Sequence, residues 1–342
     1  MKKHKFFMQR CLELAKKGFP HNSPNPMVGC VLVHKNKVIG KGYHEKYGCS
    51  HAELNAINSV SDKSLLSEST LYVNLEPCSH FGNTPPCSDL IIKYKIPKVV
   101  IGCIDTFIEV SGKGIEKMQK KGIIIESNIL EKESRELNKR FFTFHEQKRP
   151  YIILKWAKSK DGFIAPKNQI KPFWMTCKKS KRLAHKWRSE EDAILVGRIT
   201  AEKDNPLLTV REINGKNPTR IVLDKKLQLS KNLNLFNNEE KTIIFNQIKS
   251  ENKKSCLYKK VNFKYLIKNV LHELYKEKIH SIIIEGGAKT LQSFIDSGFW
   301  DEARIFTTKK KLVDGIKSPS ILGKAIKEKK VDTDTLAIIY KQ

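Results

Sequence analysis

The chain has 342 residues, a formal net charge of +28 and eight cysteines. At about 100–200 residues per domain this length predicts two domains, which excludes a small scaffold held together by disulfides. No run of about 18 apolar residues could cross a bilayer, and the charged first 18 residues do not resemble a signal peptide. We therefore expect a cytoplasmic protein without a membrane partner, whose cysteines are reduced or bind a metal.

The positive charge raises the hypothesis of a nucleic-acid partner. Of the 64 basic residues only 10 are arginine, whereas recognition of phosphates and bases favours the bidentate arginine fork. The lysines are also dispersed, with only short groups at 309–311 and 329–330. A solvated lysine surface is therefore expected, without a nucleic-acid partner. The sequence leaves a homo-oligomer open.

The predicted elements of the first half alternate between helix and strand. A helix in the first 20 residues ends at Gly18 and Pro20, and the elements after it are a hairpin at 28–33 and 38–42, helices at 51–60, 87–94, 114–121 and 131–145, and strands at 71–75, 98–103 and 123–126. This order predicts a layered α/β domain whose second half is largely parallel. Residues 147–150 are the best linker candidate, which gives domains at 1–146 and 150–342.

The alternation restarts after the linker. Strands are predicted at 151–156, 193–196, 219–223, 241–245 and 281–285, with helices at 178–187, 270–277 and 288–297. The second half therefore forms a separate α/β domain with its own core.

A zinc site is predicted from residues that fall where strands give way to helices. His51 opens a predicted helix, Cys78 follows a predicted strand, and Cys87 opens the next helix. Three protein ligands leave the fourth tetrahedral position for water, which indicates catalysis rather than a structural site. Glu53, two residues from His51, is placed to move protons, and this pattern is the signature of zinc deaminases.

Two alternatives to a catalytic zinc site stay open. His51, Cys78 and Cys87 could be a satisfied core histidine and two buried thiols. Cys49, two residues from His51, could also supply a fourth ligand and make the site structural.

The segments HAE (51–53) and PCSHFGNTPPCSDLI (77–91) resemble the deaminase domain of the bifunctional riboflavin biosynthesis family RibD. SPNPMVG (23–29) and GYHEKYG (42–48) resemble the same family, which implies that Asn25 and His44 help to hold a pyrimidine. The nucleic-acid deaminases usually have two residues between their cysteines, and here eight separate Cys78 from Cys87. A tRNA deaminase with an accessory domain is therefore kept only as the alternative.

A phosphate-binding turn is a candidate in the second half. The chain contains no Gly-x-Gly-x-x-Gly fingerprint, so a conventional dinucleotide fold is unsupported. The predicted strand at 281–285 ends in Gly286-Gly287 and leads into a helix, where backbone N–H groups can approach a diphosphate. An ordinary strand-to-helix connection has the same pattern.

The segments LKWAKSKDGFIA (154–165), WMT (174–176) and HKWRSEEDAILVGRITAEKDNPLLTVR (185–211) resemble the reductase half of the RibD family. The resemblance implies a cytidine-deaminase-like three-layer domain followed by a dihydrofolate-reductase-like domain. It also implies Zn²⁺ and NADPH as cofactors. The cofactor positions would be Ala157, Trp174, Thr200, Asp204 and Gly287, and the substrate positions would be Arg188, Leu208, Arg211 and Glu285.

The resemblance implies a function in two steps. Zinc-dependent hydrolysis would deaminate 2,5-diamino-6-(5-phosphoribosylamino)pyrimidin-4(3H)-one, and NADPH would then reduce 5-amino-6-(5-phosphoribosylamino)uracil to the ribitylamino product. The chain departs from the family at Thr106-Phe107, where Pro-Asn is common, and at Pro172, where well-known members have Ser. A zinc-stabilised binding protein is the third hypothesis, and it leaves Glu53 without a role.

Overall fold

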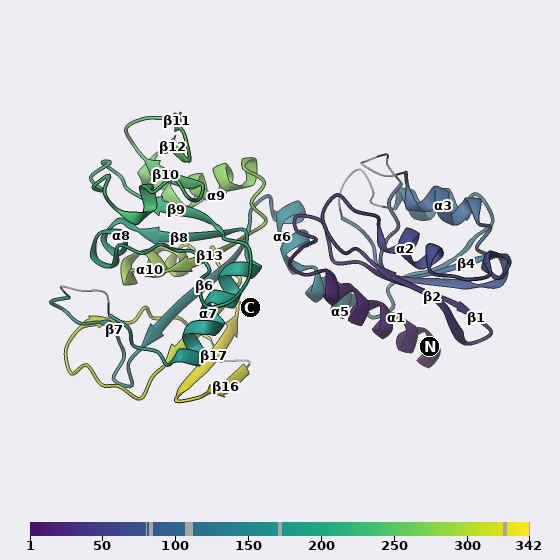
Figure 1. The fold of residues 1–342 in the computed structure, drawn as a ribbon, viewed down its shortest axis with the longest axis horizontal. Helices are drawn as coiled ribbons and strands as arrows, with labels where there is room; N and C mark the ends of the chain where they lie inside the picture. Colours follow the sequence, from purple (N-terminus) through teal and green to yellow (C-terminus); the bar gives the residue numbers. More distant parts are fainter. Residues whose placement is uncertain (80, 82–84, 107–111, 170–172, 324–326, 342) are drawn as a thin grey trace. The chain divides into compact units, whose positions relative to one another are not determined.

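The computed structural model describes residues 1–342 except 80, 82–84, 107–111, 170–172, 324–326 and 342 (Figure 1). The chain divides into two compact units, Met1–Lys148 and Arg149–Gln342. Each unit encloses its own apolar core. In the described part of the chain, no helix combines the length and apolar character that crossing a membrane requires.

The first unit is built on a five-stranded sheet in the order β2-β1-β3-β4-β5. Its strands are β1 (Gly29–His34), β2 (Lys37–Tyr43), β3 (Thr70–Leu75), β4 (Lys98–Cys103) and β5 (Ile124–Glu126). β1 pairs antiparallel with β2 and β3, whereas β3, β4 and β5 run parallel. The expected hairpin and the expected parallel second half are both present.

Helices cover both faces of this sheet (Figure 1). They are α1 (Lys2–Ala15), α2 (Ala52–Asn58), α3 (Cys87–Lys93), α4 (Lys113–Gln119), α5 (Glu131–Leu137) and α6 (Lys139–Gln147), with 3₁₀ turns at Lys16–Gly18 and Lys63–Glu68. Successive strand residues face opposite sides, so Leu32 packs with the core beneath α2 and α3 while Val31 packs against α1. The result is the expected three layers.

The single helix expected at 131–145 is wrong, because the structure divides this segment at Asn138. Asn138 lies outside the helical region, at φ −101° and ψ 23°. Its buried side chain instead pairs with the backbone of Met27: Oδ1 accepts from the Met27 N–H at 2.7 Å and Nδ2 donates to the Met27 carbonyl at 2.9 Å. This tertiary pairing competes with continuation of the helix.

The second unit is built on a ten-stranded sheet in the order β11-β12-β10-β9-β8-β13-β6-β14-β17-β16. The strands are β6 (Tyr151–Lys158), β8 (Ala193–Gly197), β9 (Thr219–Leu223), β10 (Thr242–Asn246), β11 (Glu251–Lys253), β12 (Cys256–Lys260), β13 (Ser281–Glu285), β14 (Glu302–Thr307), β16 (Lys327–Val331) and β17 (Asp334–Tyr340). From β12 through β14 the neighbours are parallel, so these strands end at one edge. Ligands of α/β sheets bind at this edge.

Both faces of the large sheet are also covered. The helices are α7 (Lys178–Glu190), α8 (Arg198–Asp204), α9 (Leu266–Lys276) and α10 (Ala288–Asp296), with 3₁₀ turns at Asn234–Phe236 (η3) and Phe263–Tyr265 (η4). Helices α9 and α10 bury Leu271 and Phe294 on one face. On the other face, α7 buries Trp187, while Ala201 and Leu235 pack in a separate cluster. A short ladder of β7 (Phe163–Ala165) and β15 (Ile316–Lys317) lies apart from the large sheet.

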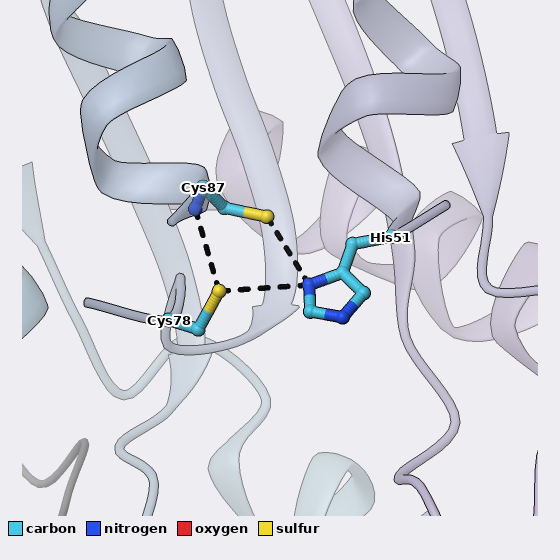
Figure 2. Close-up of side chains that lie close together, drawn as sticks. All are labelled: His51, Cys78 and Cys87. Carbon is cyan, nitrogen blue, oxygen red and sulfur yellow. Dashed lines mark hydrogen bonds between the residues drawn. The ribbon is translucent and has the colours of Figure 1, made fainter. Parts of the chain in front are cut away.

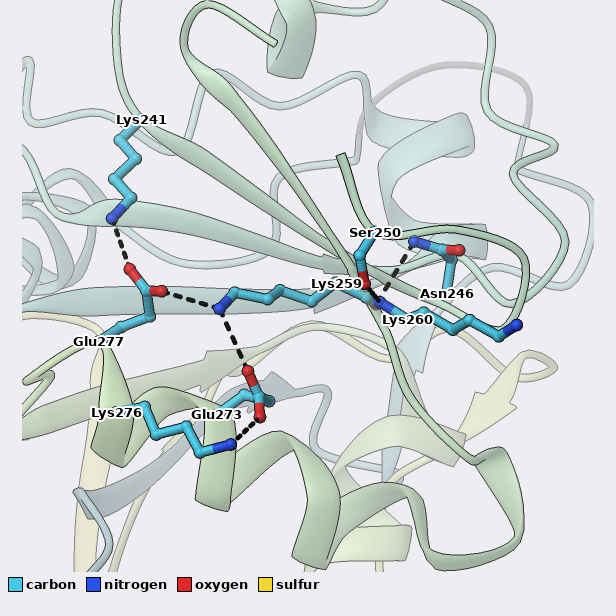
Figure 3. Close-up of polar contacts among 8 residues, drawn as sticks. All are labelled: Lys241, Asn246, Ser250, Lys259, Lys260, Glu273, Lys276 and Glu277. Carbon is cyan, nitrogen blue, oxygen red and sulfur yellow. Dashed lines mark hydrogen bonds and ion pairs between the residues drawn. The ribbon is translucent and has the colours of Figure 1, made fainter. Parts of the chain in front are cut away.

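An ion-pair network ties α9 to β10 and β12 (Figure 3). The Lys259 ammonium lies 2.9 Å from Glu277 and 3.1 Å from Glu273. Lys241, directly before β10, reaches the other oxygen of Glu277 at 2.8 Å, and Lys276 pairs with Glu273 at 2.9 Å. Because these groups are partly exposed, the network is worth at most about 1 kcal/mol per pair.

Candidate functional sites

The structure brings His51, Cys78 and Cys87 together at the edge of the first sheet (Figure 2). His51 is the N-cap of α2, Cys87 is the first residue of α3, and Cys78 follows β3. Their ligand atoms all lie within 4.8 Å of one another. The Nδ1 atom of His51 is 3.5 Å from Sγ of Cys78 and 3.4 Å from Sγ of Cys87.

These distances fit a tetrahedral zinc ion. Zn–S and Zn–N bonds of about 2.3 and 2.05 Å at the tetrahedral angle place a nitrogen and a sulfur about 3.6 Å apart. The donor set of one imidazole and two thiols is one that zinc prefers. The predicted alternative ligand, Cys49, is exposed and lies outside the group of possible ligands found in the described residues.

Local backbone contacts hold the two cysteines in place. The Cys87 N–H donates to Sγ of Cys78 at 3.3 Å, and the Ser88 N–H donates to the Cys78 carbonyl at 3.1 Å. Two residues before Cys78, the buried Glu76 carboxylate accepts N–H groups from Asp105, Gly112, Gly114 and Ile115 at 3.1–3.4 Å. The turn that carries Cys78 is thereby fixed to the start of α4.

Glu53 lies in the first turn of α2 and is only 3% exposed. Burial, together with the negative charge of Cys78, raises the pKa of the Glu53 carboxyl to about 7. Hydrogen bonds from Cys87 and His51 lower the pKa of the Cys78 thiol to about 4 despite its burial. The hydrogen bond to Cys78 raises the pKa of His51. The cluster therefore favours a thiolate at Cys78, the form that binds metal.

Asn25 and His44 form a pair beside the same site. The ring of His44 lies 5.5 Å from the ring of His51, and its Nδ1 is 3.1 Å from the Ser50 carbonyl. A carbonyl only accepts, so the proton of the neutral ring is on Nδ1, and Nε2 accepts from Nδ2 of Asn25 at 3.0 Å. In the described part of the chain nothing donates to Oδ1 of Asn25, so this oxygen can accept a hydrogen bond from a ligand.

The second unit contains a cavity of about 440 Å³. Its lining includes every described residue that the sequence analysis assigns to the reductase site. The cofactor candidates in its lining are Ala157, Trp174, Thr200, Asp204 and Gly287, and the substrate candidates are Arg188, Leu208, Arg211 and Glu285. These residues come from segments up to 130 positions apart in the chain. Phe107 and Pro172 lie outside the described residues, and Thr106 is half-buried.

Two glycines form the turn between β13 and α10. Gly286 and Gly287 have φ values of 85° and 70°, which side chains rarely allow. A Cβ on Gly286 would meet Cγ2 of Thr200 at 2.7 Å, and one on Gly287 would lie 3.1 Å from its Oγ1. Glycine at both positions keeps this close backbone turn open to a phosphate, so the lining fits NADPH.

A buried charged cluster occupies the cavity at the end of β13. Nη2 of Arg188 lies 2.7 Å from Oε2 of Glu285, and Nζ of Lys155 lies 3.8 Å from Oε1. Burial alone would raise the pKa of Glu285, but the charges of Arg188 and Lys155 lower it to about 2. Sequence analysis missed Lys155, although it is the one charged residue in the apolar segment YIILKWA. The structure pairs Lys155 with Glu285 in the register of β6 and β13.

His185 supports the backbone at Arg211. It is 1% exposed, and its Nδ1 accepts the Arg211 N–H at 3.0 Å. Burial, followed by the charges of Arg188 and Arg211, lowers the pKa of His185 to about 4. Sequence analysis also missed His185, which lies three residues from Arg188 on the same face of α7.

The chain is similar to known proteins over its whole length. Residues 1–103 match the cytidine and deoxycytidylate deaminase zinc-binding region, and residues 150–324 match the RibD C-terminal domain. The riboflavin biosynthesis protein RibD of Aquifex aeolicus is 40% identical, over 99% of this chain and 98% of the relative.

Solved structures agree with this similarity. The diaminohydroxyphosphoribosylaminopyrimidine deaminase/5-amino-6-(5-phosphoribosylamino)uracil reductase of Thermotoga maritima has a TM-score of 0.89 at 34% identity, covering 100% of this chain and 99% of that one. Acinetobacter baumannii RibD has a TM-score of 0.90 at 28% identity, with the same coverage.

Proposed function

The chain belongs to the RibD family of riboflavin biosynthesis proteins, and we propose that the residues gathered in its two units carry out the family's two reactions. It is a bifunctional enzyme with a zinc-dependent deaminase and an NADPH-dependent reductase. The deaminase acts on 2,5-diamino-6-(5-phosphoribosylamino)pyrimidin-4(3H)-one, and the reductase converts 5-amino-6-(5-phosphoribosylamino)uracil to the ribitylamino product. We assign residues 1–146 to the first activity and 150–342 to the second.

In the first unit, His51, Cys78 and Cys87 would hold zinc. When bound, zinc lowers the pKa of a water ligand so that hydroxide is available near neutral pH. Glu53 is buried two residues after His51, where it takes one proton from the attacking water and delivers it to the ring nitrogen. It then takes the second proton, from the newly added hydroxyl, and delivers it to the leaving amine. Asn25 presents Oδ1 to a donor group of the pyrimidine, and His44 fixes the orientation of that amide.

In the second unit, the turn at Gly287 with Thr200 and Asp204 holds the cofactor, and Ala157 and Trp174 complete its walls. NADPH supplies the hydride. The protein positions the two ligands in one cavity.

The substrate of the reductase is held by the charged part of the same cavity. Arg211 provides a cation for its phosphate, because arginine binds phosphate with a bidentate fork. Glu285 holds the guanidinium of Arg188 in the cavity, and Leu208 contributes an apolar contact. These placements rest on one observation: the charged and glycine-rich segments of the unit meet in a single cavity.

We propose a cytoplasmic location, which is supported by the free state of the eight cysteines. The tRNA deaminase alternative is not favoured, since it gives the second unit no role and the relatives match almost the whole chain.

Two substitutions test the assignment by separating the activities. Glu53→Gln keeps the side-chain shape and removes the proton shuttle, so deamination should fall by roughly 10²–10⁴ while reduction of supplied intermediate stays near the parental rate. Arg211→Ala should show the reverse pattern. Exposed residues of each unit supply matched controls, Glu45→Gln and Arg182→Ala, which should leave both rates unchanged.

Both reactions are followed in parallel, as ammonia release and as NADPH oxidation. Loss of reduction in a folded, zinc-loaded Glu53→Gln protein would refute the division between the units. Unchanged deamination in that variant would show that another residue is the proton shuttle.

A further inference from the structure

Arg220 carries a buried charge and does not belong to the cavity lining. It lies in β9, is 0% exposed, and is the largest fully buried side chain among the described residues. Burying a guanidinium is unfavourable unless its donors are satisfied. What Arg220 contacts therefore indicates which part of the structure requires it.

Among the described residues, the side-chain hydrogen bonds of Arg220 go to the segment that joins β9 to β10 and to the first residue of β10. Nη1 donates to the Asn234 carbonyl at 3.1 Å and to Oδ1 of Asn237 at 3.0 Å. Nη2 donates to the Glu240 carbonyl at 2.8 Å, and Nε donates to Oγ1 of Thr242 at 3.0 Å. One side chain thus holds residues 234–242, of which only 234–236 form a helical turn before β10.

The segment held by Arg220 in turn supports the cavity. Asn234 lines the cavity, and its N–H donates to Oδ1 of Asn205 at 2.7 Å. The amide of Asn234 also donates to the Asn205 carbonyl at 2.7 Å. Asn205 ends α8 in the left-handed region at φ 39°, directly after Asp204, the proposed cofactor residue.

The neighbouring contacts leave this segment little freedom. Lys241, between Glu240 and Thr242, is paired with Glu277, the residue directly after α9 (Figure 3). The Thr242 hydroxyl that accepts from Arg220 donates to the Leu235 carbonyl at 2.9 Å. Loss of the hydrogen bonds from Arg220 would therefore mainly displace Asn234, which is hydrogen-bonded to Asn205 at the cavity.

We propose that Arg220 is a positioning residue for the cofactor: through Asn234 it fixes Asn205 and the adjoining Asp204 in the wall that binds NADPH. This inference rests on the proposed placement of NADPH at Asp204. Arg220 touches neither ligand, so its substitution should weaken NADPH binding and leave deamination unchanged.

Arg220→Lys keeps the charge but replaces the fork with one ammonium, which cannot reach all four acceptors. The dissociation constant of NADPH, measured by titration without substrate, should rise about 5- to 30-fold, the factor for losing one or two such hydrogen bonds. The KM for NADPH should rise with it, while kcat at saturating NADPH changes little. Tryptophan fluorescence of the same protein reports that the second unit is folded, because all four tryptophans lie after residue 150.

A second variant protects the test against a failure of Arg220→Lys to fold. Asn205 is exposed, and Asn205→Gly tolerates φ 39° while removing the oxygen that Asn234 binds. It should weaken NADPH binding in the same direction. Asp332→Gly is the matched control, because Asp332 is also exposed and left-handed, at φ 58°, but lies outside both the 234–242 segment and the cavity lining.

The outcomes are distinct. If Arg220→Lys or Asn205→Gly lowers the melting temperature while the NADPH dissociation constant stays at the parental value, Arg220 is structural only and the proposal is wrong. Asp204→Ala tests the premise separately: if it leaves NADPH binding unchanged, the proposed cofactor site itself fails. Weaker NADPH binding in all three variants, with Asp332→Gly unchanged, supports the positioning role of Arg220.

Discussion

Replacing Glu285 by Gln should destabilise the second unit at neutral pH and much less in acid. Glu285 is 8% exposed, and its carboxylate lies 2.7 Å from Arg188. Its pKa of about 2, against an ordinary 4.5, means that the folded state favours the ionised form. Since one pKa unit corresponds to about 1.4 kcal/mol, ionisation contributes about 3 kcal/mol at pH 7.

The direction of the pH dependence follows from the lowered pKa. The contribution is complete above pH about 4.5 and is lost as the pH falls towards 2, because the unfolded state then binds the proton first. Glutamine mimics the protonated acid, so the gap in unfolding free energy between parent and Glu285→Gln should shrink from about 3 to about 1.5 kcal/mol between pH 7 and pH 3.

Tryptophan fluorescence isolates the relevant unit, because all four tryptophans lie after residue 150. Urea unfolding of the full chain would be followed at pH 7, 5 and 3 for the parent and for Glu285→Gln. The exposed Glu328 of β16 gives the control Glu328→Gln, which should leave the curves within about 0.5 kcal/mol. A gap that is equal at pH 7 and pH 3 would refute the charged role of Glu285.

Further outcomes are expected elsewhere in the chain. Metal analysis should find one zinc per chain, retained in Cys49→Ser and lost in Cys78→Ser; the opposite pattern would contradict the ligand assignment. As the pH falls from 6.5 to 4, the free energy of unfolding of the parent should fall by up to about 1.4 kcal/mol per pH unit relative to that of His185→Gln. The reason is that in this range the His185 ring takes up a proton in the unfolded state but not in the folded state. Parallel pH profiles of the two proteins would refute this. The charges facing that ring are Arg188, Arg211, Glu212 and Glu285. Lys259→Met should cost at most about 1 kcal/mol per lost pair, and high salt should reduce the loss; a salt-independent effect would show that packing dominates.

The local pattern of the sequence was enough to predict most elements around the two sites. The alternation at Val31 and Leu32 marks a strand that is buried on both faces, and the structure contains it as β1. The glycines after residue 285 mark the turn into α10. The motif spacing predicted the zinc deaminase class, which the comparisons support, because its residues sit at helix starts that local sequence defines.

Other features depend on partners that the local pattern does not contain. Asn138 interrupts a helical pattern because its amide binds Met27, 111 residues away. The two edge strands of the large sheet are β11 and β16, which are short, contain lysine and were not predicted from the sequence. These strands are stabilised by pairing with their neighbours more than by their own composition.

The sequence by itself determined the α/β class, the two core-forming halves and the types of residue that can bind zinc, because these follow from short-range periodicity and side-chain chemistry. Only the tertiary structure decided that Lys155 lies opposite Glu285, that His185 supports Arg211, and that Arg220 reaches the Asn234 carbonyl. The order of the strands in the sheet decides which of these distant residues come into contact. The order β8-β13-β6 places residues 130 positions apart in one register, and the free energy of that arrangement comes from burial of the whole sheet rather than from any single segment.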